Sequence, residues 1–185
     1  MAVNGPSLLS LKGNQYLIKF LDFEASFIRL LEKVTNGSAI EINHTGTMVT
    51  YHPGVITGGS IHHDCPNTRA IGYFLESIIA LAPFAKKPFN LVLTGITNDN
   101  VDISVDLIRT VLLPQLARFG VDDSIELKIN KRGALPLGGG QVTFTCPIVR
   151  ALKPVQFIDQ GLVKRIRGIA YGTDFALKTP ILTID

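Results

Sequence analysis

The sequence holds little charge, few cysteines and no long apolar run. Charged residues make up 18% of the 185 residues and apolar residues 46%, a balance that supports a sizeable core and excludes a disordered chain. The two cysteines, Cys65 and Cys146, lack the CxxC or Cys/His spacing of a metal site, which favours a reduced, intracellular protein. Pro83 and Pro88 interrupt the most apolar region, so we expect no membrane span and no membrane partner.

The positive charge is small overall but unevenly placed. A formal net charge of +3 does not by itself indicate a nucleic-acid partner, so the distribution of the basic residues has to decide. They gather in two places, at Lys131-Arg132 before a run of glycines and at Lys164, Arg165 and Arg167 further on. Both groups are candidates for binding RNA or a partner protein.

The first basic group leads into a glycine-rich turn. The runs Ser124–Asn130 and Gln141–Cys146 alternate apolar and polar residues on either side of Gly138, Gly139 and Gly140, a pattern that predicts a β-hairpin. Glycines adopt positive φ and leave backbone N–H groups uncovered, so this turn suits a phosphate, with Lys131 and Arg132 close in sequence. The alternative is a wide turn without a ligand. The spacing favours that alternative, because the loop runs into a strand where a P-loop runs into a helix.

The second basic group lies in the run LVKRIRG. If Leu162–Ile169 forms a strand, Arg165 and Arg167 share one face and Lys164 lies on the other. Two arginines on one exposed face suit phosphate contacts, because a guanidinium binds phosphate through two parallel hydrogen bonds. An edge strand protected by charge is an equally good interpretation. No aromatic residues accompany the group, so the pattern does not favour stacking on single-stranded bases.

An internal repeat indicates the fold class. Helical spacing over Asp22–Val34 and over Val105–Phe119 is followed in each case by a β-hairpin, and Ile28-Arg29 corresponds to Ile108-Arg109. A strand precedes each copy, at Gln15–Phe20 and Asn90–Gly95, and a helix over Ala70–Leu81 connects them. We therefore expect an α+β fold of repeated split β-α-β units, each a small mixed sheet with two helices. The expected units are residues 1–88, 89–150 and the truncated start of a third at 151–185.

The third helix carries two specific expectations. Pro114 lies inside it and predicts a kink, because proline removes a backbone donor and clashes with the preceding turn. Asp102 or Ser104 is expected to cap its start. Its apolar side should pack on the following hairpin, with Leu107, Leu112, Leu116 and Phe119 buried.

The histidines suggest a metal site only weakly. His62-His63-Asp64-Cys65 follows His44 and His52 in the chain, but adjacent histidines point apart and no regular spacing supplies further ligands. We expect an ordered loop here, with His63 or Asp64 near the start of the next helix, and no metal. Ser/His/Asp catalysis also has no nucleophile-elbow motif to support it.

Several longer segments together carry a resemblance to a known family. FEASFIRLLEKVTNGSAIEINHTGT, YHPGVITGGSIHHDCP, AIGYFLESIIALAPF, KRGALPLGGGQVTF and KRIRGIAY are similar to the RNA 3′-terminal phosphate cyclase superfamily, above all to its eukaryotic cyclase-like branch. The resemblance covers about residues 22–171. It implies a stack of repeated α+β units with an inserted small domain, which is absent here. The first unit also lacks a strand between Phe20 and Leu21, and after Tyr171 the family pattern is lost.

The resemblance also implies a function. The cyclase-like branch implies a component of the small-subunit processome that acts in pre-rRNA processing and 18S rRNA maturation in the nucleolus. The implied partners are a nucleolar ribosome-assembly GTPase, pre-rRNA and a small nucleolar RNP.

The resemblance favours a role without catalysis. True cyclases carry a nucleotide-accepting histidine in their C-terminal half, and none of the four histidines of this chain matches it. They also carry a glutamate and several glycines where this chain has the stretch 12–19, KGNQYLIK. We therefore expect no catalytic residue and no cofactor. The alternative is an active RNA-end-processing enzyme, either an RNA 3′-phosphate cyclase or an rRNA endonuclease, whose catalytic half lies outside this chain.

Overall fold

The computed structural model describes residues 21–44, 46–121, 124–159, 161–164, 166, 168–170 and 182–184. The chain divides into two compact units, Met1–Lys153 and Pro154–Asp185, and each is described by itself. The expected strand Gln15–Phe20 and the junction between Phe20 and Leu21 lie outside the described residues. Among the residues described, no helix is long and apolar enough to cross a membrane.

A four-stranded mixed sheet forms the centre of the first unit. Its strands are β5 (Gly59–Asp64), β6 (Phe89–Gly95), β7 (Glu126–Lys131) and β8 (Gly140–Cys146). They are ordered β5-β6-β8-β7, with β5 parallel to β6 and the other two pairs antiparallel. The predicted pairing of β7 with β8 as an antiparallel hairpin is confirmed.

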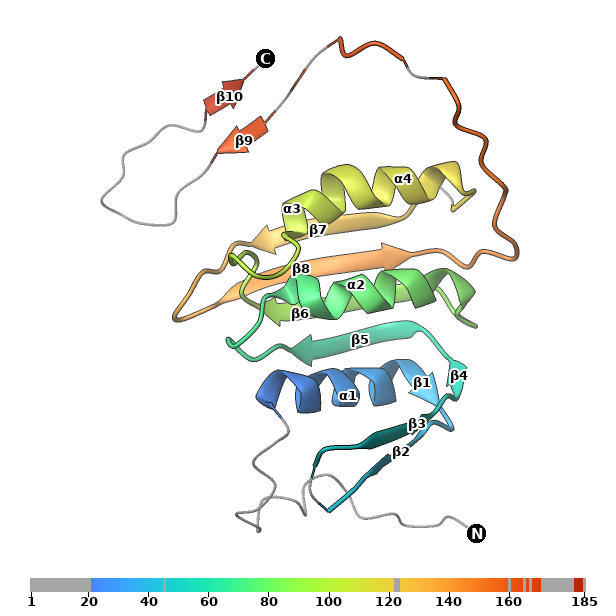
Figure 1. The fold of residues 1–185 in the computed structure, drawn as a ribbon, viewed down its shortest axis with the longest axis vertical. Coiled ribbons are helices and arrows are strands. Elements are labelled where there is room, and N and C mark those ends of the chain that lie inside the picture. The colour runs from blue at the N-terminus through green and yellow to red at the C-terminus, as the bar shows by residue number, and fades with distance from the viewer. Residues whose placement is uncertain are drawn as a thin grey trace. The chain divides into compact units, whose positions relative to one another are not determined.

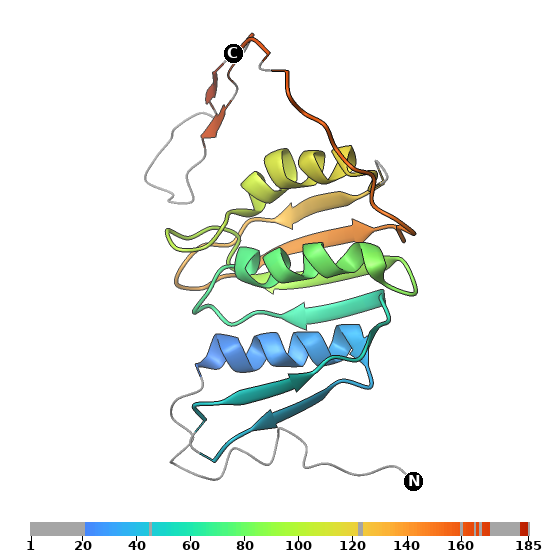
Figure 2. The ribbon, with the colours of Figure 1, turned by 45° about the vertical axis from the view of Figure 1, so that its right-hand side comes forward.

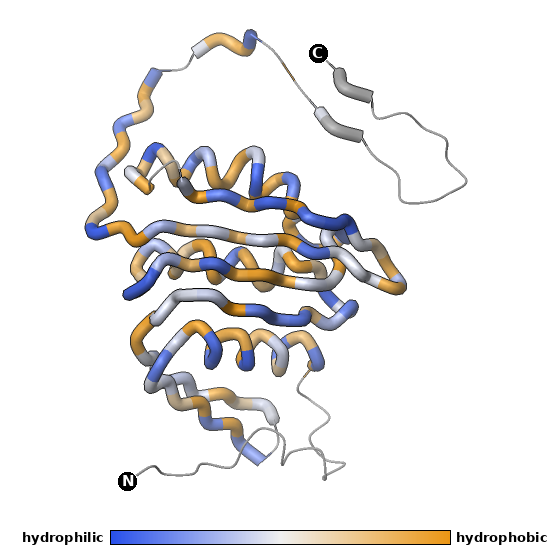
Figure 3. Tube along the Cα trace, turned by 180° about the vertical axis from the view of Figure 1, so that it is seen from behind, coloured by the Kyte–Doolittle hydropathy of each residue, from blue (hydrophilic) through white to orange (hydrophobic). Residues whose placement is uncertain are grey.

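Two helical segments cover one face of this sheet (Figures 1 and 2). The first is α2 (Ile71–Leu81), which continues into the 3₁₀ turn η2 (Ala82–Phe84). The second comprises α3 (Val105–Leu107), the π-helical turn η3 (Ile108–Leu112) and α4 (Leu113–Arg118). Strand residues alternate in burial, so the apolar side chains face the helices and the polar ones face away. Figure 3 shows the same sheet from behind.

The third helix confirms one expectation and corrects another. Ser104 caps its start, since the Ser104 hydroxyl accepts a hydrogen bond from the Leu107 N–H at 3.1 Å. The regular hydrogen bonding widens into a π turn just before Pro114, which lacks the N–H that an α-helical bond would need there. The expected burial of Leu107 and Phe119 is wrong, because their side chains are 47% and 43% exposed.

The buried stripe of this helix lies on a different face. The side chains that pack against the sheet are Val105, Ile108 and Leu113, with Leu112 and Leu116 partly buried beside them. The π turn inserts one residue, so the buried positions do not follow a single 3.6-residue period through the helix.

The segment before the central sheet contains a helix and short strands. α1 (Asp22–Val34) has the predicted bounds, and its start is stabilised by the Leu21 N–H, which donates to the Glu24 carboxylate at 3.0 Å. β2 (Ala39–Ile42) and β3 (Val49–His52) form the predicted antiparallel hairpin. Two further short strands, β1 (Thr35–Asn36) and β4 (Val55–Ile56), also pair antiparallel.

The structure overturns the loop expected at His62–Cys65. His62, His63 and Asp64 belong to β5, where their side chains alternate between exposed and buried, and Cys65 follows the strand directly. Pairing with β6 supplies the backbone hydrogen bonds that the sequence pattern alone did not reveal. β5 belongs by sequence to the predicted first unit, residues 1–88, but it pairs with β6, which lies in the predicted second unit. The division into repeats at 88 and 150 stays a prediction.

The core links α1 to the central sheet. Leu30 and Val34 of α1 join one buried cluster with Phe74 and Ile78 of α2 and with Phe144 of β8. In the second unit, β9 (Gly168–Ala170) and β10 (Leu182–Ile184) pair antiparallel. Helices and small mixed sheets together confirm the α+β fold class.

Candidate functional site

The first group of expected binding residues lies at one end of the central sheet. Lys131 ends β7, Gly138 and Gly139 form the turn, and Gly140 begins β8. The hairpin register shifts by one residue between Ile129 and Lys131, which turns the last residue of β7 away from the regular alternation. Figure 3 shows a hydrophilic end of β7 beside a hydrophobic hairpin tip.

Close packing and backbone angles account for the three glycines. Gly138 has a φ of +67°, and a Cβ there would overlap the side-chain oxygen of Asn67. Gly139 has a φ of +78° with open space around it, whereas a Cβ on Gly140 would lie 2.7 Å from the Gly133 nitrogen. The Gly138 N–H already donates to the Ala134 carbonyl at 2.8 Å. These contacts explain a glycine turn without a phosphate, and a phosphate role stays a prediction.

The hairpin is held to neighbouring loops by hydrogen bonds. The buried Thr97, which follows β6, donates its N–H to the Gly133 carbonyl at 2.9 Å, and its hydroxyl oxygen accepts from the Gly133 N–H at 3.2 Å. Asn67 Nδ2 donates to the Pro136 carbonyl at 3.1 Å. The turn is therefore fixed relative to the ends of β5 and β6.

The two basic residues of the hairpin differ in their surroundings. Arg132 forms a two-bond ion pair with Asp106 at the start of the third helix, at 2.7 Å and 2.8 Å. The Asp106 carboxylate offsets the guanidinium charge, so Arg132 ties the hairpin to the helix. Lys131 is exposed and is the better placed of the two for an external anion.

A second arginine–aspartate pair lies at the same end of the sheet. Arg69 donates to both Asp102 oxygens, with Arg69 Nε at 3.0 Å and 2.9 Å from them, and its guanidinium lies 5.0 Å from the ring centroid of Phe23 and 4.5 Å from that of Tyr73. Burial by itself would raise the pKa of Asp102, but the hydrogen bonds from Arg69 and from the Ala70 N–H outweigh it and lower that pKa. This pair fixes the loop before α3 against α1 and α2.

His63 is buried and joins α1 to β5. Its Nε2 lies 2.9 Å from the Ser26 hydroxyl, and its side chain is beside Phe74. Burial, with the positive charge of Lys33 as a second cause, lowers the pKa of His63 to about 4. His63 is therefore neutral at physiological pH, and its contacts are those of a core residue.

The cysteines are not reactive thiolates at neutral pH. Burial raises the pKa of Cys65 to about 12 and that of Cys146 to about 11. Within the described parts of the chain, no group of three or more His, Cys, Asp or Glu side chains could hold a metal ion.

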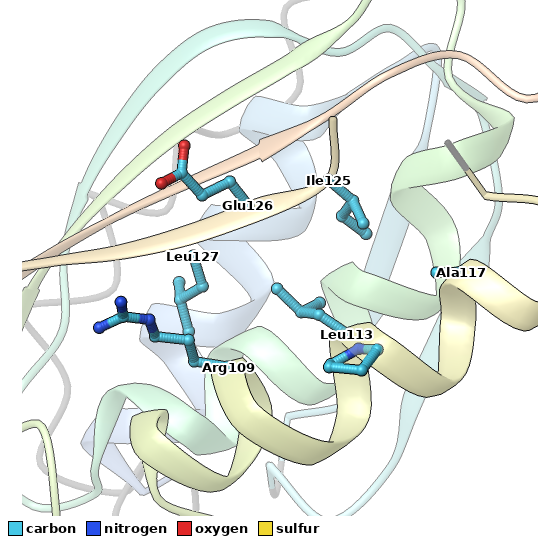
Figure 4. A pocket seen from close by; sticks show the side chains of 7 residues that line it. Arg109, Leu113, Ala117, Ile125, Glu126 and Leu127 are labelled. Atoms are coloured by element: carbon cyan, nitrogen blue, oxygen red, sulfur yellow. The ribbon is translucent and has the colours of Figure 1, made fainter. Parts of the chain in front are cut away.

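An apolar groove runs between α4 and β7 (Figure 4). Its volume is about 420 Å³, and its lining consists of Arg109, Leu113, Pro114, Ala117, Ile125, Glu126 and Leu127. None of the expected binding residues lines it. Sequence patterns gave no sign of this groove, because its walls come from a helix and a strand edge that only the fold brings together.

The second group of expected residues lies in the other unit. Lys164 is exposed, whereas Arg165 and Arg167 lie outside the described residues. Of the run that the sequence suggested as a strand, the structure assigns β9 at Gly168–Ala170. Lys131 and Arg132 thus lie at the same hairpin end as the three glycines. The role of Lys164, Arg165 and Arg167 in binding stays a prediction.

Comparison with known proteins identifies the family. The model of the RNA 3′-terminal phosphate cyclase family matches residues 20–181. RNA 3′-terminal phosphate cyclase-like proteins of Bos taurus and Homo sapiens are 60% and 59% identical over 151 residues, which is 81% of this chain. The rRNA processing protein rcl1 of Schizosaccharomyces pombe is 55% identical over 154 residues, or 82% of the chain.

The matches cover only part of each relative. The chain spans 40% of the length of the Bos taurus and Homo sapiens proteins and 42% of the Schizosaccharomyces pombe protein. More than half of each relative therefore lies outside the match. The family match itself extends over most of this chain, from before α1 to beyond β9, and so the chain belongs to the RNA 3′-terminal phosphate cyclase family.

Proposed function

We propose that this chain is part of a non-catalytic ribosome biogenesis factor that acts in pre-rRNA processing and 18S rRNA maturation. The observation that carries the proposal is the 55% identity, over 82% of the chain, to a protein named for rRNA processing. Burial lowers the pKa of His63 and raises the pKa values of Cys65 and Cys146, so none of these three side chains is charged at neutral pH.

The proposed place of action is the small-subunit processome in the nucleolus. The partners are a nucleolar ribosome-assembly GTPase, pre-rRNA and a small nucleolar RNP. The exposed Lys131, together with Lys164, Arg165 and Arg167, supplies positive charge for RNA phosphates. Arg132, held by Asp106, orients the hairpin and contributes less charge to a partner.

Depletion in the cells that express the protein tests the biological role. Loss of the protein should lower mature 18S rRNA relative to large-subunit rRNA, with accumulation of 18S precursors on northern blots. An unchanged ratio of the two mature rRNAs after depletion would contradict the proposal.

Binding measurements test the RNA contacts. The full chain should bind an 18S precursor fragment with an affinity that falls steeply with salt, because phosphate contacts release counterions. The double variant Arg165→Ala/Arg167→Ala should bind more weakly across all sequences, with the log–log salt slope reduced by about two. Lys86→Ala/Lys87→Ala is the matched control, since these exposed lysines precede β6 at the opposite end of the sheet from Lys131.

The outcomes separate the two interpretations of the second basic group. If Arg165→Ala/Arg167→Ala keeps its RNA affinity but no longer binds the GTPase, the group is a protein interface. If it loses neither, the group is a charge-protected edge strand and the proposed RNA contacts are wrong.

An active RNA-end-processing enzyme is the second candidate. The description of the matched family, RNA 3′-terminal phosphate cyclase, favours it, and more than half of each relative lies outside the match. Incubation of the full-length protein with ATP and a 3′-phosphate RNA distinguishes the two. Adenylylated protein or a cyclic RNA end would contradict the non-catalytic proposal.

A further inference from the structure

The segment of residues 21–55 shares no strand pair with the central sheet among the described residues. Its strands β1, β2 and β3 pair as β1 with β4 and β2 with β3, whereas the central sheet consists of β5, β6, β8 and β7. The segment instead contacts this sheet through α1, which lies alongside β5 in Figures 1 and 2. Because β5 is the first strand in the order of the sheet, separation of α1 from its outer edge breaks no strand pair.

Two side chains of α1 contact the same residues of β5. Lys33 Nζ donates to the His62 carbonyl at 2.9 Å and lies 3.4 Å from His63 Nδ1. On the other side of the ring, His63 Nε2 lies 2.9 Å from the Ser26 hydroxyl. Ser26 and His63 are buried. One imidazole of the strand therefore bridges two residues of the helix.

The ammonium group of Lys33 determines which nitrogen of the His63 ring carries the hydrogen. An ammonium group donates and does not accept, so His63 Nδ1 is the acceptor and Nε2 carries the hydrogen. Nε2 then donates to the Ser26 oxygen. A second proton on the ring has to bind at Nδ1. That proton removes the acceptor for Lys33 and places a positive charge beside the Lys33 ammonium.

The other groups around the ring oppose this second proton. The charged and titratable groups that face the ring come from α1 and β5 and are Lys33, Arg29, His62 and Asp64. From α2 the ring meets Phe74, at 6.0 Å between ring centroids. Of the charged groups, Asp64 alone favours the protonated form. Burial and the charge of Lys33 outweigh Asp64, and the pKa of His63 is therefore lowered to about 4.

We propose that His63 is an acid-sensitive latch that holds α1 against the edge of β5. The neutral ring accepts from Lys33 and donates to Ser26. The protonated ring loses the Lys33 contact, and residues 21–55 then open as one unit while the central sheet stays folded. A contiguous segment without shared strand pairs suits such a local opening. The buried Leu30 keeps the open state rare at neutral pH.

The end of α1 provides the point of attachment for this opening. The Val34 carbonyl accepts hydrogen bonds from the Thr57 N–H at 2.9 Å and from the Thr57 hydroxyl at 3.1 Å. The Ile56 carbonyl accepts from the Lys86 N–H at 3.0 Å, just before β6. These backbone contacts do not involve the His63 ring. They therefore hold the chain to the central sheet when the latch opens.

Hydrogen exchange of the full chain, followed by mass spectrometry, tests the latch. After correction for the intrinsic exchange rate at each pH, the protection of α1 should fall roughly 40-fold between pH 6.5 and 4.5. The reason is that the open state binds a proton that the closed state does not bind. The β7–β8 hairpin is the internal control and should keep its protection. A parallel loss in α1 and in this hairpin would mean global unfolding and would overturn the proposal.

Two variants distinguish the latch from a merely structural contact. Glutamine gains no proton in this pH range, so the protection of α1 in His63→Gln should not depend on pH. In Lys33→Met, an NMR titration of the His63 ring should give a higher pKa than in the wild type, because the neighbouring charge is gone. Lys128→Met, at an exposed lysine of β7, is the matched control and should titrate like the wild type. An unchanged pH dependence in His63→Gln overturns the proposal, as does an unchanged pKa in Lys33→Met.

Discussion

The helices α1 and α3–α4 take corresponding places in the predicted internal repeat, yet they differ in the burial of their apolar side chains. In α1, Leu30 and Val34 are completely buried and Phe27 lies against two aromatic rings of α2. In the third helix, Leu107 and Val111 are nearly half exposed. An apolar stripe in the sequence therefore does not say what covers it. Elements far away in the sequence decide this, as α2 does where it covers Phe27.

The largest expected effect is the difference in stability between a truncation in α1 and one in the third helix. Leu30→Ala should lower the free energy of unfolding by roughly 2–5 kcal/mol, because it opens a cavity where the helix meets the central sheet. Leu107→Ala should cost less, about 1 kcal/mol, because nearly half of Leu107 stays exposed to water. Urea unfolding of both variants checks the contrast. Equal losses would show that the third helix is as well packed as the first.

The two arginine–aspartate pairs give the next contrast. Asp102, beside α1 and α2, has a side chain only 4% exposed, whereas Asp106 on α3 is 23% exposed. Asp102→Ala should cost about 2–3 kcal/mol, because the partly buried Arg69 would lose the carboxylate to which it donates its hydrogen bonds. Asp106→Ala should cost about 1 kcal/mol or less.

Thermal melts at neutral pH rank these two variants. A larger loss at Asp106 would mean that the hairpin anchor, and not the α1 contact, holds this end of the sheet together.

His63 makes the α1 contact sensitive to acid. The folded-state pKa of about 4 lies below the ordinary value of 6.5, so the unfolded state binds more protons between these two values. The free energy of unfolding should therefore fall by roughly 1–3 kcal/mol as the pH drops from 6.5 to 4. Above pH 6.5 His63 adds no further pH dependence, because it is neutral in both states.

The His63→Gln variant isolates this contribution. Its stability should change less than that of the wild type over the same pH window when both are measured by chemical unfolding. An identical pH dependence in the two proteins would show that His63 does not control acid sensitivity, and that carboxylates such as Asp102 dominate it.

The smallest expected effect lies in the hairpin that follows the third helix. Gly139→Ala should cost about 1 kcal/mol, because an alanine is strained at positive φ but meets no other atom there. Gly138→Ala should cost somewhat more, since its Cβ also displaces the Asn67 side chain that binds Pro136. Urea unfolding of the two variants should reveal the difference. Equal losses would mean that the Asn67 contact adds nothing to the hairpin.

Much of the secondary structure follows from local signals. The bounds of α1, the β7–β8 hairpin and the Ser104 cap agree with the spacing of apolar residues and with capping chemistry. Pro114 marks where the third helix departs from α geometry. The sequence pattern does not reveal strand β5, because a short run with two histidines and an aspartate has little apolar alternation; its pairing with β6 makes it a strand.

The candidate site was predictable only in part. The sequence indicated that Lys131, Arg132 and the three glycines share one hairpin end, and the structure places them there. It did not indicate that Asp106, 26 residues earlier, would bind Arg132. Nor did it indicate that Gly138 and Gly140 serve close packing against Asn67 and Gly133.

The sequence by itself determined which segments become helices and hairpins and the family to which the chain belongs. Those properties depend on residues close together in the chain. Only the tertiary structure decided that β5 completes the central sheet and that His63 is a neutral core residue. It also decided that Leu30 and Val34 of α1 are fully buried, whereas Leu107 and Val111 of the third helix are nearly half exposed. Each of these depends on contacts between residues far apart in the sequence, which no local pattern encodes.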